Sequence, residues 1–135
     1  MSSEWVMLVP SLVFTRIKSS FSEEIKATYN MKDKNFSTKK TKESAVFPFV
    51  YVHLLPAVEQ GQDLEGNNIN AGLFTFQIEV YDNQSHSRAR AVMGEVLRIM
   101  KSMRFDCIAL PEIEDGDTIR CVSRFRRIIG SGDVL

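Results

Sequence analysis

The sequence is poor in the residues on which nucleophilic catalysis, metal binding and cross-linking usually depend. It contains two histidines, His53 and His86, and two cysteines, Cys107 and Cys121. Neither histidine lies beside a Ser or Cys in a recognisable local motif, so a nucleophilic triad is unsupported. The spacing of the cysteines matches no zinc-binding pattern. We therefore predict that the protein is not an enzyme and that it uses no metal and no other cofactor.

Long apolar runs are also missing. No run approaches the ~18 apolar residues of a membrane span, and the opening MSSEWVMLVPSLVF places no basic region before its short apolar run. We expect a soluble protein that is made in a cytoplasm and has no membrane contact. A chain of 135 residues with an ordinary composition suits one domain with its own core, and we treat residues 1–135 as that domain.

An excess of either charge is absent, since 17 Lys and Arg residues balance 17 Asp and Glu residues. The balance hides a segregation: residues 1–42 hold 8 basic and 4 acidic residues, residues 43–87 hold 6 acidic and no basic residues, and residues 88–135 hold 9 basic and 7 acidic residues. Segments of opposite sign suggest surfaces that pair between copies of the protein or with other proteins, and they argue against an ordinary basic nucleic-acid binder. The other interpretation is a chance distribution over a solvated surface.

What the sequence does contain is a clear architectural block at residues 47–103. Apolar and polar residues alternate strictly over residues 73–81 (LFTFQIEVY), which predicts a strand with one buried face. Residues 47–56 (FPFVYVHLLP) are apolar on both faces, which predicts a strand covered on two sides. Residues 85–103 follow a helical period, with Asn83 or Ser85 as the cap of the predicted helix.

The flanking stretches complete the predicted fold. Residues 9–29 predict a first helix with Pro10 in its first turn, and Phe36 allows one short edge strand. Residues 104–110 and 118–129 predict a closing hairpin. The fold class is therefore α+β, with a mostly antiparallel mixed sheet of about four to six strands packed by two helices, in the order α-β-β-β-α-β-β.

Polar stretches join these elements and follow the last one. A Lys-rich link at about residues 30–45 and a tail at residues 130–135 are expected to be flexible, and a long hairpin loop is expected at about residues 59–72. In the closing hairpin, a two-residue turn at Asp115-Gly116 would place Cys121 opposite Leu110, out of register with Cys107, so we expect no disulfide and two small core residues. The acids of residues 112–117 indicate an exposed turn. A bound hard cation is the other possibility, although the stretch lacks EF-hand spacing.

Contacts with other copies or partners are the functional signal that remains. The long loop contains two apolar residues among glycines and asparagines, which favours docking onto a partner over free disorder. Three arginines share one face of the last strand and need carboxylates, phosphates or water, and the lysines after Phe36 allow an arm that reaches a neighbour. The candidate contact residues are Asp63, Leu64, Glu65, Asn67, Asn68, Ile69, Arg120, Arg124, Arg126, Lys39 and Lys40.

The element order and several stretches resemble the tail-terminator and tail-completion (tail-to-head joining) proteins of long-tailed bacteriophages. The stretches are FPFVYVHLLP at residues 47–56, FTFQIEVYDN at residues 74–83 and RFRRIIGSGD at residues 124–133. The likeness extends over nearly the whole chain and rests on element order, size and the character of these stretches. Because that family has no catalytic motif, no residue role is carried over from it.

The resemblance implies a structural virion protein with a small α+β fold. Such a protein caps the tail tube, stops its elongation and forms part of the interface to the head connector as a ring, expected to hold about six copies. Its partners would be further copies of itself, the tail tube protein and the head–tail connector or stopper protein, with DNA only passing through the ring lumen. It would be made in the host cytoplasm and lie at the head-proximal end of the virion tail. Another interpretation is a small sheet-based binding module for a peptide or single-stranded nucleic acid.

Overall fold

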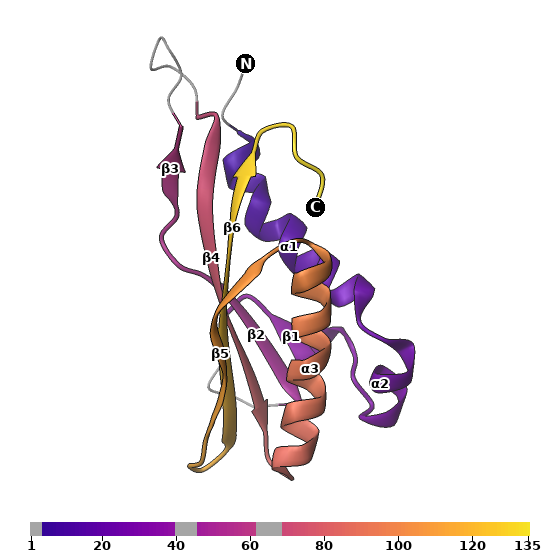
Figure 1. Ribbon diagram of the computed structural model, residues 1–135. Coiled ribbons are helices and arrows are strands. Elements are labelled where there is room, and N and C mark those ends of the chain that lie inside the picture. The colour runs from indigo at the N-terminus through magenta and orange to yellow at the C-terminus, as the bar shows by residue number, and fades with distance from the viewer. Residues whose placement is uncertain (1–3, 40–45, 62–68) are drawn as a thin grey trace.

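Strand β4, Ala71–Asp82, is the element on which the fold is built. The computed structural model describes residues 4–39, 46–61 and 69–135. Within these residues a six-stranded sheet forms one layer, and the helices form a second layer on one side of it (Figure 1). The predicted α+β class and the mixed, mostly antiparallel sheet are therefore confirmed, since β1 and β2 are the only described strands that pair in parallel.

The sheet order is β1-β2-β4-β6-β5, and the short β3 pairs with the first residues of β4. The longest ladder joins β4 to β6 over twelve residue pairs, from Ala71 opposite Gly130 to Asp82 opposite Ile119. The other strands are β1 (Phe36–Ser37), β2 (Phe49–Leu54), β3 (Val58–Gln60), β5 (Asp106–Glu114) and β6 (Ile119–Gly130).

The core lies between the sheet and the helices. The alternation in β4 predicts its buried face correctly, because Phe74, Phe76, Ile78 and Val80 are all buried. Phe76 stands opposite Phe125 of β6 and meets Phe105 edge-on, with 5.7 Å between the ring centroids. Complete burial of one such side chain stabilises the fold by about 1.5–3 kcal/mol, so this face accounts for much of the driving force for folding.

Helix α3, His86–Ser102, covers the middle of this face. Its predicted cap is confirmed, because the Ser85 hydroxyl accepts a hydrogen bond from the Arg88 backbone nitrogen at 3.1 Å. The predicted apolar stripe is also confirmed, and its members Ala89, Met93, Val96 and Met100 are buried.

The single helix predicted at residues 9–29 is wrong, because α1 (Trp5–Ser20) and α2 (Glu23–Thr28) are separate. The break is fixed from α3, where Glu95 accepts a hydrogen bond from the Ser22 backbone nitrogen and Arg98 donates to the Ser20 carbonyl at 2.9 Å. Helix α1 also begins earlier than predicted, which leaves Pro10 inside it.

The early start of α1 has a tertiary cause at Trp5. The indole packs on Phe74 with 6.2 Å between ring centroids, and its nitrogen donates a hydrogen bond to the Ile69 carbonyl at 3.3 Å. These contacts hold the first turn of the helix against the start of β4. The predicted order α-β-β-β-α-β-β thus differs from the structure by a second N-terminal helix and by the extra strand β3.

The polar stretches contain more regular structure than their composition indicates. The 3₁₀ helix η1 (Asp33–Asn35) leads into β1, which confirms the predicted short edge strand at Phe36. Asn35 is fully buried and donates a hydrogen bond to the Pro48 carbonyl at 2.7 Å. At the other stretch, β3 pairs with residues 71–73, so both ends of the expected long loop belong to the sheet.

The β5–β6 hairpin differs from its predicted register. Cys121 lies opposite Ile113 rather than Leu110, and the strands end at Glu114 and Ile119, so the turn is longer than two residues. Glu114 and Arg120 form the last rung of the ladder and are held by an ion pair of 2.9 Å. Cys107 lies opposite Phe125, and both cysteines are free thiols.

Candidate functional site

The side of the sheet that faces away from the helices, which we call the open face, is the candidate site. The cross-strand register arranges its side chains in rows that run from one edge strand toward the other. The rows are Phe49–Tyr81–Arg120, Tyr51–Glu79–Val122, His53–Gln77–Arg124, Thr75–Arg126 and Val58–Leu73–Ile128.

A hydrogen-bonded network around Glu79 occupies one end of the open face. The Glu79 carboxylate accepts hydrogen bonds from Arg120 Nε at 2.7 Å, from the Tyr81 hydroxyl at 2.6 Å and from Gln77 Nε2 at 3.0 Å. Burial by itself would raise the pKa of Glu79, but these three bonds and the charge of Arg120 outweigh burial and lower that pKa. Arg120 also contacts Glu114 at 2.9 Å, so this end of the face is satisfied within the chain.

The other two predicted arginines lie farther along the same face and are exposed. Arg124 Nε donates to Gln77 Oε1 at 2.9 Å, and Arg126 stands opposite Thr75 on one side and Asp106 on the other. The structure therefore divides the three arginines: Arg120 belongs to an internal network, while Arg124 and Arg126 present charge to the solvent. Arg120 obtains its carboxylates from Glu114 and Glu79, and sequence reasoning missed Glu79 as the main partner.

An apolar row lies at the opposite end of the open face. Val58 of β3, Leu73 of β4 and Ile128 of β6 stand side by side across the three strands. Val58 and Ile128 are each 56% exposed. Three neighbouring apolar side chains on an uncovered sheet face are typical of a contact surface rather than of a solvated strand.

Aromatic residues share the open face but offer little ring surface. Phe49 and Tyr51 are only 7% and 9% exposed, and Tyr81 is half-buried within the Glu79 network. His53 is exposed and stacks on Tyr51 with 5.7 Å between centroids. Flat stacking of nucleic-acid bases on this face therefore has few rings available.

The remaining sequence-predicted contact residues fall in several places. Lys39 is exposed just beyond β1 at one edge of the sheet. Ile69 lies two residues before the start of β4, near the end of the sheet that carries the apolar row, and its carbonyl accepts a hydrogen bond from the Trp5 indole. The others lie outside the described residues: Lys40, Asp63, Leu64, Glu65, Asn67 and Asn68.

Two further buried acids hold elements together. Asp82, at the end of β4, binds Arg88 Nε at 2.7 Å and the Ser85 backbone nitrogen at 3.0 Å. Burial would raise the pKa of Asp82, but these hydrogen bonds outweigh it and lower that pKa. For Glu95, the hydrogen bond from Arg98 lowers the pKa more than burial raises it. Both carboxylates fix helix ends, Asp82 at the start of α3 and Glu95 at the junction of α1 and α2.

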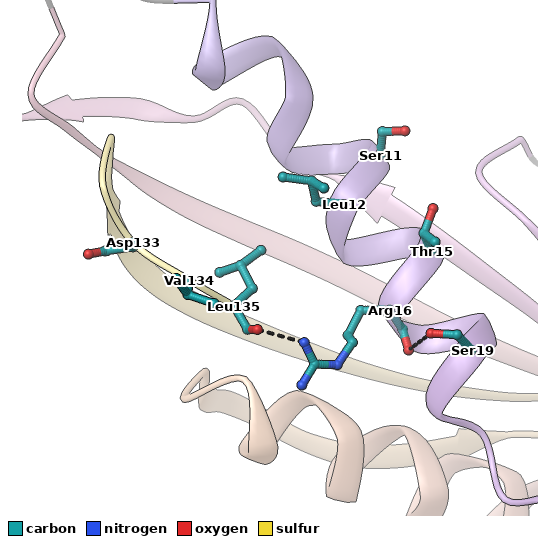
Figure 2. A pocket seen from close by; sticks show the side chains of 8 residues that line it. All are labelled: Ser11, Leu12, Thr15, Arg16, Ser19, Asp133, Val134 and Leu135. Carbon is teal, nitrogen blue, oxygen red and sulfur yellow. Dashed lines mark hydrogen bonds between the residues drawn. The ribbon is translucent and has the colours of Figure 1, made fainter.

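Two open hollows lie on the surface of the described residues. Figure 2 shows one of about 460 Å³ between α1 and the last residues of the chain, where Arg16 donates a hydrogen bond to the Leu135 carbonyl at 2.6 Å. A smaller one of about 250 Å³ lies between α3 and β5, with the buried thiol of Cys121 in its lining. Burial raises the pKa of that thiol, which keeps it protonated and unreactive.

The described part of the chain contains no group of three His, Cys, Asp or Glu side chains placed to hold a metal ion. In the predicted acidic turn, Glu114 binds Arg120 and Asp115 binds His86 Nε2 at 2.6 Å. Over residues 4–39, 46–61 and 69–135, no helix combines the length and apolar character that crossing a membrane requires. We therefore take the open face as the candidate site.

Comparison with protein-family models and with curated protein sequences finds no match to this chain.

Proposed function

We propose that this protein is a structural assembly protein that caps a bacteriophage tail tube as an oligomeric ring and forms part of the interface to the head connector. The observation that carries the proposal is the open face, on which exposed Val58 and Ile128 flank Leu73 in one continuous apolar row. A sheet that uses only one face for its own core has its second face available for another protein.

The distribution of charge on the open face supports a protein partner. Arg124 and Arg126 are exposed between the apolar row and the satisfied Glu79 network. An apolar centre with arginines at its side is the composition of many protein–protein contacts, where apolar burial supplies affinity and the charges set orientation. The resemblance of the sequence to tail-terminator proteins gives this contact a particular biological setting.

The direct test is to locate the protein on tail tubes. The chain would be produced with the tail tube protein of the same genome, labelled at one terminus with gold, and examined by negative-stain electron microscopy. We expect label at one end of each tube and tubes of limited length. Label along the whole tube, or unbound protein beside tubes of unlimited length, would overturn the proposal.

A charge-reversal variant separates contact from folding in this test. Arg124→Glu removes an exposed cation whose only hydrogen bond among the described residues is to Gln77. We expect its free energy of unfolding to change by less than ~1 kcal/mol, because an exposed side chain contributes little to stability. Its binding to tube ends should nevertheless fall. The matched control is Glu24→Lys, which reverses an exposed charge on α2, far from the open face.

A second candidate function is a binding module for single-stranded nucleic acid. The observation that favours it is the stack of exposed His53 on Tyr51 in the rows beside Arg124 and Arg126. Such a module would bind oligonucleotides with an affinity that falls steeply as salt is raised, and fluorescence anisotropy would detect it. The low exposure of Tyr51 and Phe49 makes this the weaker of the two candidates.

A further inference from the structure

The two edges of the sheet carry charge of opposite sign. At the β1 edge, Lys32, Lys34 and Lys39 are exposed around a strand that pairs only with β2 among the described strands, and Asp33 is the acid among them. We call these three lysines the basic edge. They give this edge a net positive charge on side chains that are free to meet a partner.

The β5 edge is acidic. No Lys or Arg occurs between Phe105 and Ile119. Strand β5 and its turn present the exposed acids Asp106, Glu112, Glu114, Asp115 and Asp117, which we call the acidic edge. Glu114 pairs with Arg120, Asp115 contacts His86, and Asp106 stands opposite Arg126 without an ion pair, so Glu112 and Asp117 are the acids of this edge that have neither an ion pair nor a basic cross-strand neighbour among the described residues.

The acidic edge also exposes large apolar side chains. Leu110 is 78% exposed and Ile108 is 42% exposed, and both lie where the register of β5 shifts between Cys107 and Glu112. Among the described strands β5 pairs only with β6, and an edge strand whose side chains include exposed leucine and isoleucine is a ready contact for another chain. Acids around such a strand restrict which chains can approach it.

The two edges cannot neutralise each other within one copy. Strands β2, β4 and β6 lie between β1 and β5 in the sheet order. At about 4.8 Å between neighbouring strands, the edges are roughly 19 Å apart, which exceeds the screening length of ~8 Å in physiological salt. Opposite charges that are too distant to interact within a copy are complementary between copies.

We propose that copies of this protein associate head to tail, with the acidic edge of one copy against the basic edge of the next. The contact joins two different surfaces, so an open assembly keeps one free edge of each sign at its two ends, and repetition produces a closed ring or an open filament. The inference deepens the proposed function, because it assigns the subunit contact of the ring to the sheet edges and leaves the open face for the tube or connector. The contact itself is tested without any tail protein.

The experiment measures self-association of the purified chain by sedimentation velocity and light scattering over a range of protein and salt concentrations. One variant, Asp106→Lys with Glu112→Lys, places two lysines on the acidic edge and removes most of its negative charge. The other, Lys34→Glu with Lys39→Glu, makes both edges acidic. These positions are chosen because none of their side chains forms an ion pair among the described residues.

We expect the wild-type chain to associate and to dissociate as salt is raised. Each variant alone should associate at least about tenfold more weakly, because like charges then face each other across the contact. An equimolar mixture of the two variants should regain the association, because the lysines introduced in one variant then face the glutamates introduced in the other. Recovery on mixing also demonstrates that both variants are folded.

The matched control is Glu23→Lys with Glu24→Lys, which changes the net charge by the same amount on α2 and should leave the association unchanged. Three results would overturn the proposal: a wild-type chain that is monomeric at every concentration and salt, variants that associate as the wild type does, or a mixture that fails to recover. If head-to-tail association is found but gold label never appears at tube ends, the inference stands and the proposed function fails.

Discussion

The two faces of the sheet come from the same strands but have different roles. Phe74, Phe76, Ile78 and Val80 point from β4 into the helices and are buried, whereas Leu73, Thr75, Gln77 and Tyr81 point the other way and remain partly exposed. The covered face is filled by apolar contacts within the chain, and the open face is a series of polar rows that ends in an apolar one.

This contrast separates the residues that stabilise the fold from those available to contact other proteins. Residues of the covered face are constrained by the helices packed against them, so their substitution is expected to change stability first. Residues of the open face, apart from Glu79, Phe49 and Tyr51, meet solvent in the single chain, so their substitution is expected to change assembly first. The comparison can be tested at neighbouring positions, because successive residues of a strand belong to opposite faces.

The largest effect is expected from truncating the covered face. Phe125→Ala removes a fully buried ring opposite Phe76 and should lower the free energy of unfolding by about 3–5 kcal/mol. Its neighbour Arg126 is exposed on the open face, and Arg126→Ala should change that free energy by less than ~0.5 kcal/mol. Urea unfolding followed by circular dichroism measures both. Equal losses for the two variants would contradict the assignment of the faces.

A smaller effect is expected at Glu79, a buried charged residue of the open face. Glu79→Gln removes the charge that Arg120 pairs with, and it should lower the free energy of unfolding at neutral pH by about 1–3 kcal/mol. Glu114 remains as a partner for Arg120, which keeps the loss below that of an isolated buried charge.

The pH dependence of the free energy of unfolding tests whether the Glu79 carboxylate causes this loss. Since the pKa of Glu79 is lowered in the folded chain, its stabilising contribution is complete above the ordinary value of 4.5 and is lost as the pH falls through the folded value. The difference between wild type and Glu79→Gln should therefore shrink on acidification. Glu112→Gln, an exposed acid near the same end, is the control and should give no comparable difference at any pH.

The sequence predicted the parts of the fold that depend on local pattern. The alternation of residues 73–81, the helical period of residues 85–103 and the cap at Ser85 each appear as predicted, because burial and capping act over a few neighbouring residues. The break between α1 and α2 was missed because its causes, Glu95 and Arg98, come from a helix more than 70 residues away.

The candidate site was predictable to a lesser degree. The arginine face of β6 was found from alternation alone, but its division into paired Arg120 and exposed Arg124 depends on register with β4, which single-strand patterns do not give. The apolar row was missed for the same reason. Val58, Leu73 and Ile128 are far apart in the sequence, and only the pairing of three strands makes them neighbours.

A modest gain in stability is expected on the outer side of the covering helix. Gly94 lies in the interior of α3, is exposed, and has open space where a Cβ would stand, so Gly94→Ala should raise the free energy of unfolding by up to ~1 kcal/mol. The control is Gly61→Ala, which also has open space but a φ of +74°, a conformation that disfavours a side chain. Thermal unfolding should show opposite signs for the two substitutions.

At Ile128 we expect the smallest change in stability together with a large change in assembly. Ile128→Thr keeps a β-branched side chain in β6 but removes apolar surface from the exposed row, so the free energy of unfolding should change by about 0.5 kcal/mol or less. Binding to tail-tube ends should drop if the row is a contact surface. The control is Ile129→Thr, whose side chain is 2% exposed on the covered face and whose loss should appear in urea unfolding instead. If Ile128→Thr binds tube ends as the wild type does, the apolar row is not the contact, and Arg124 and Arg126 become the part of the open face to test next.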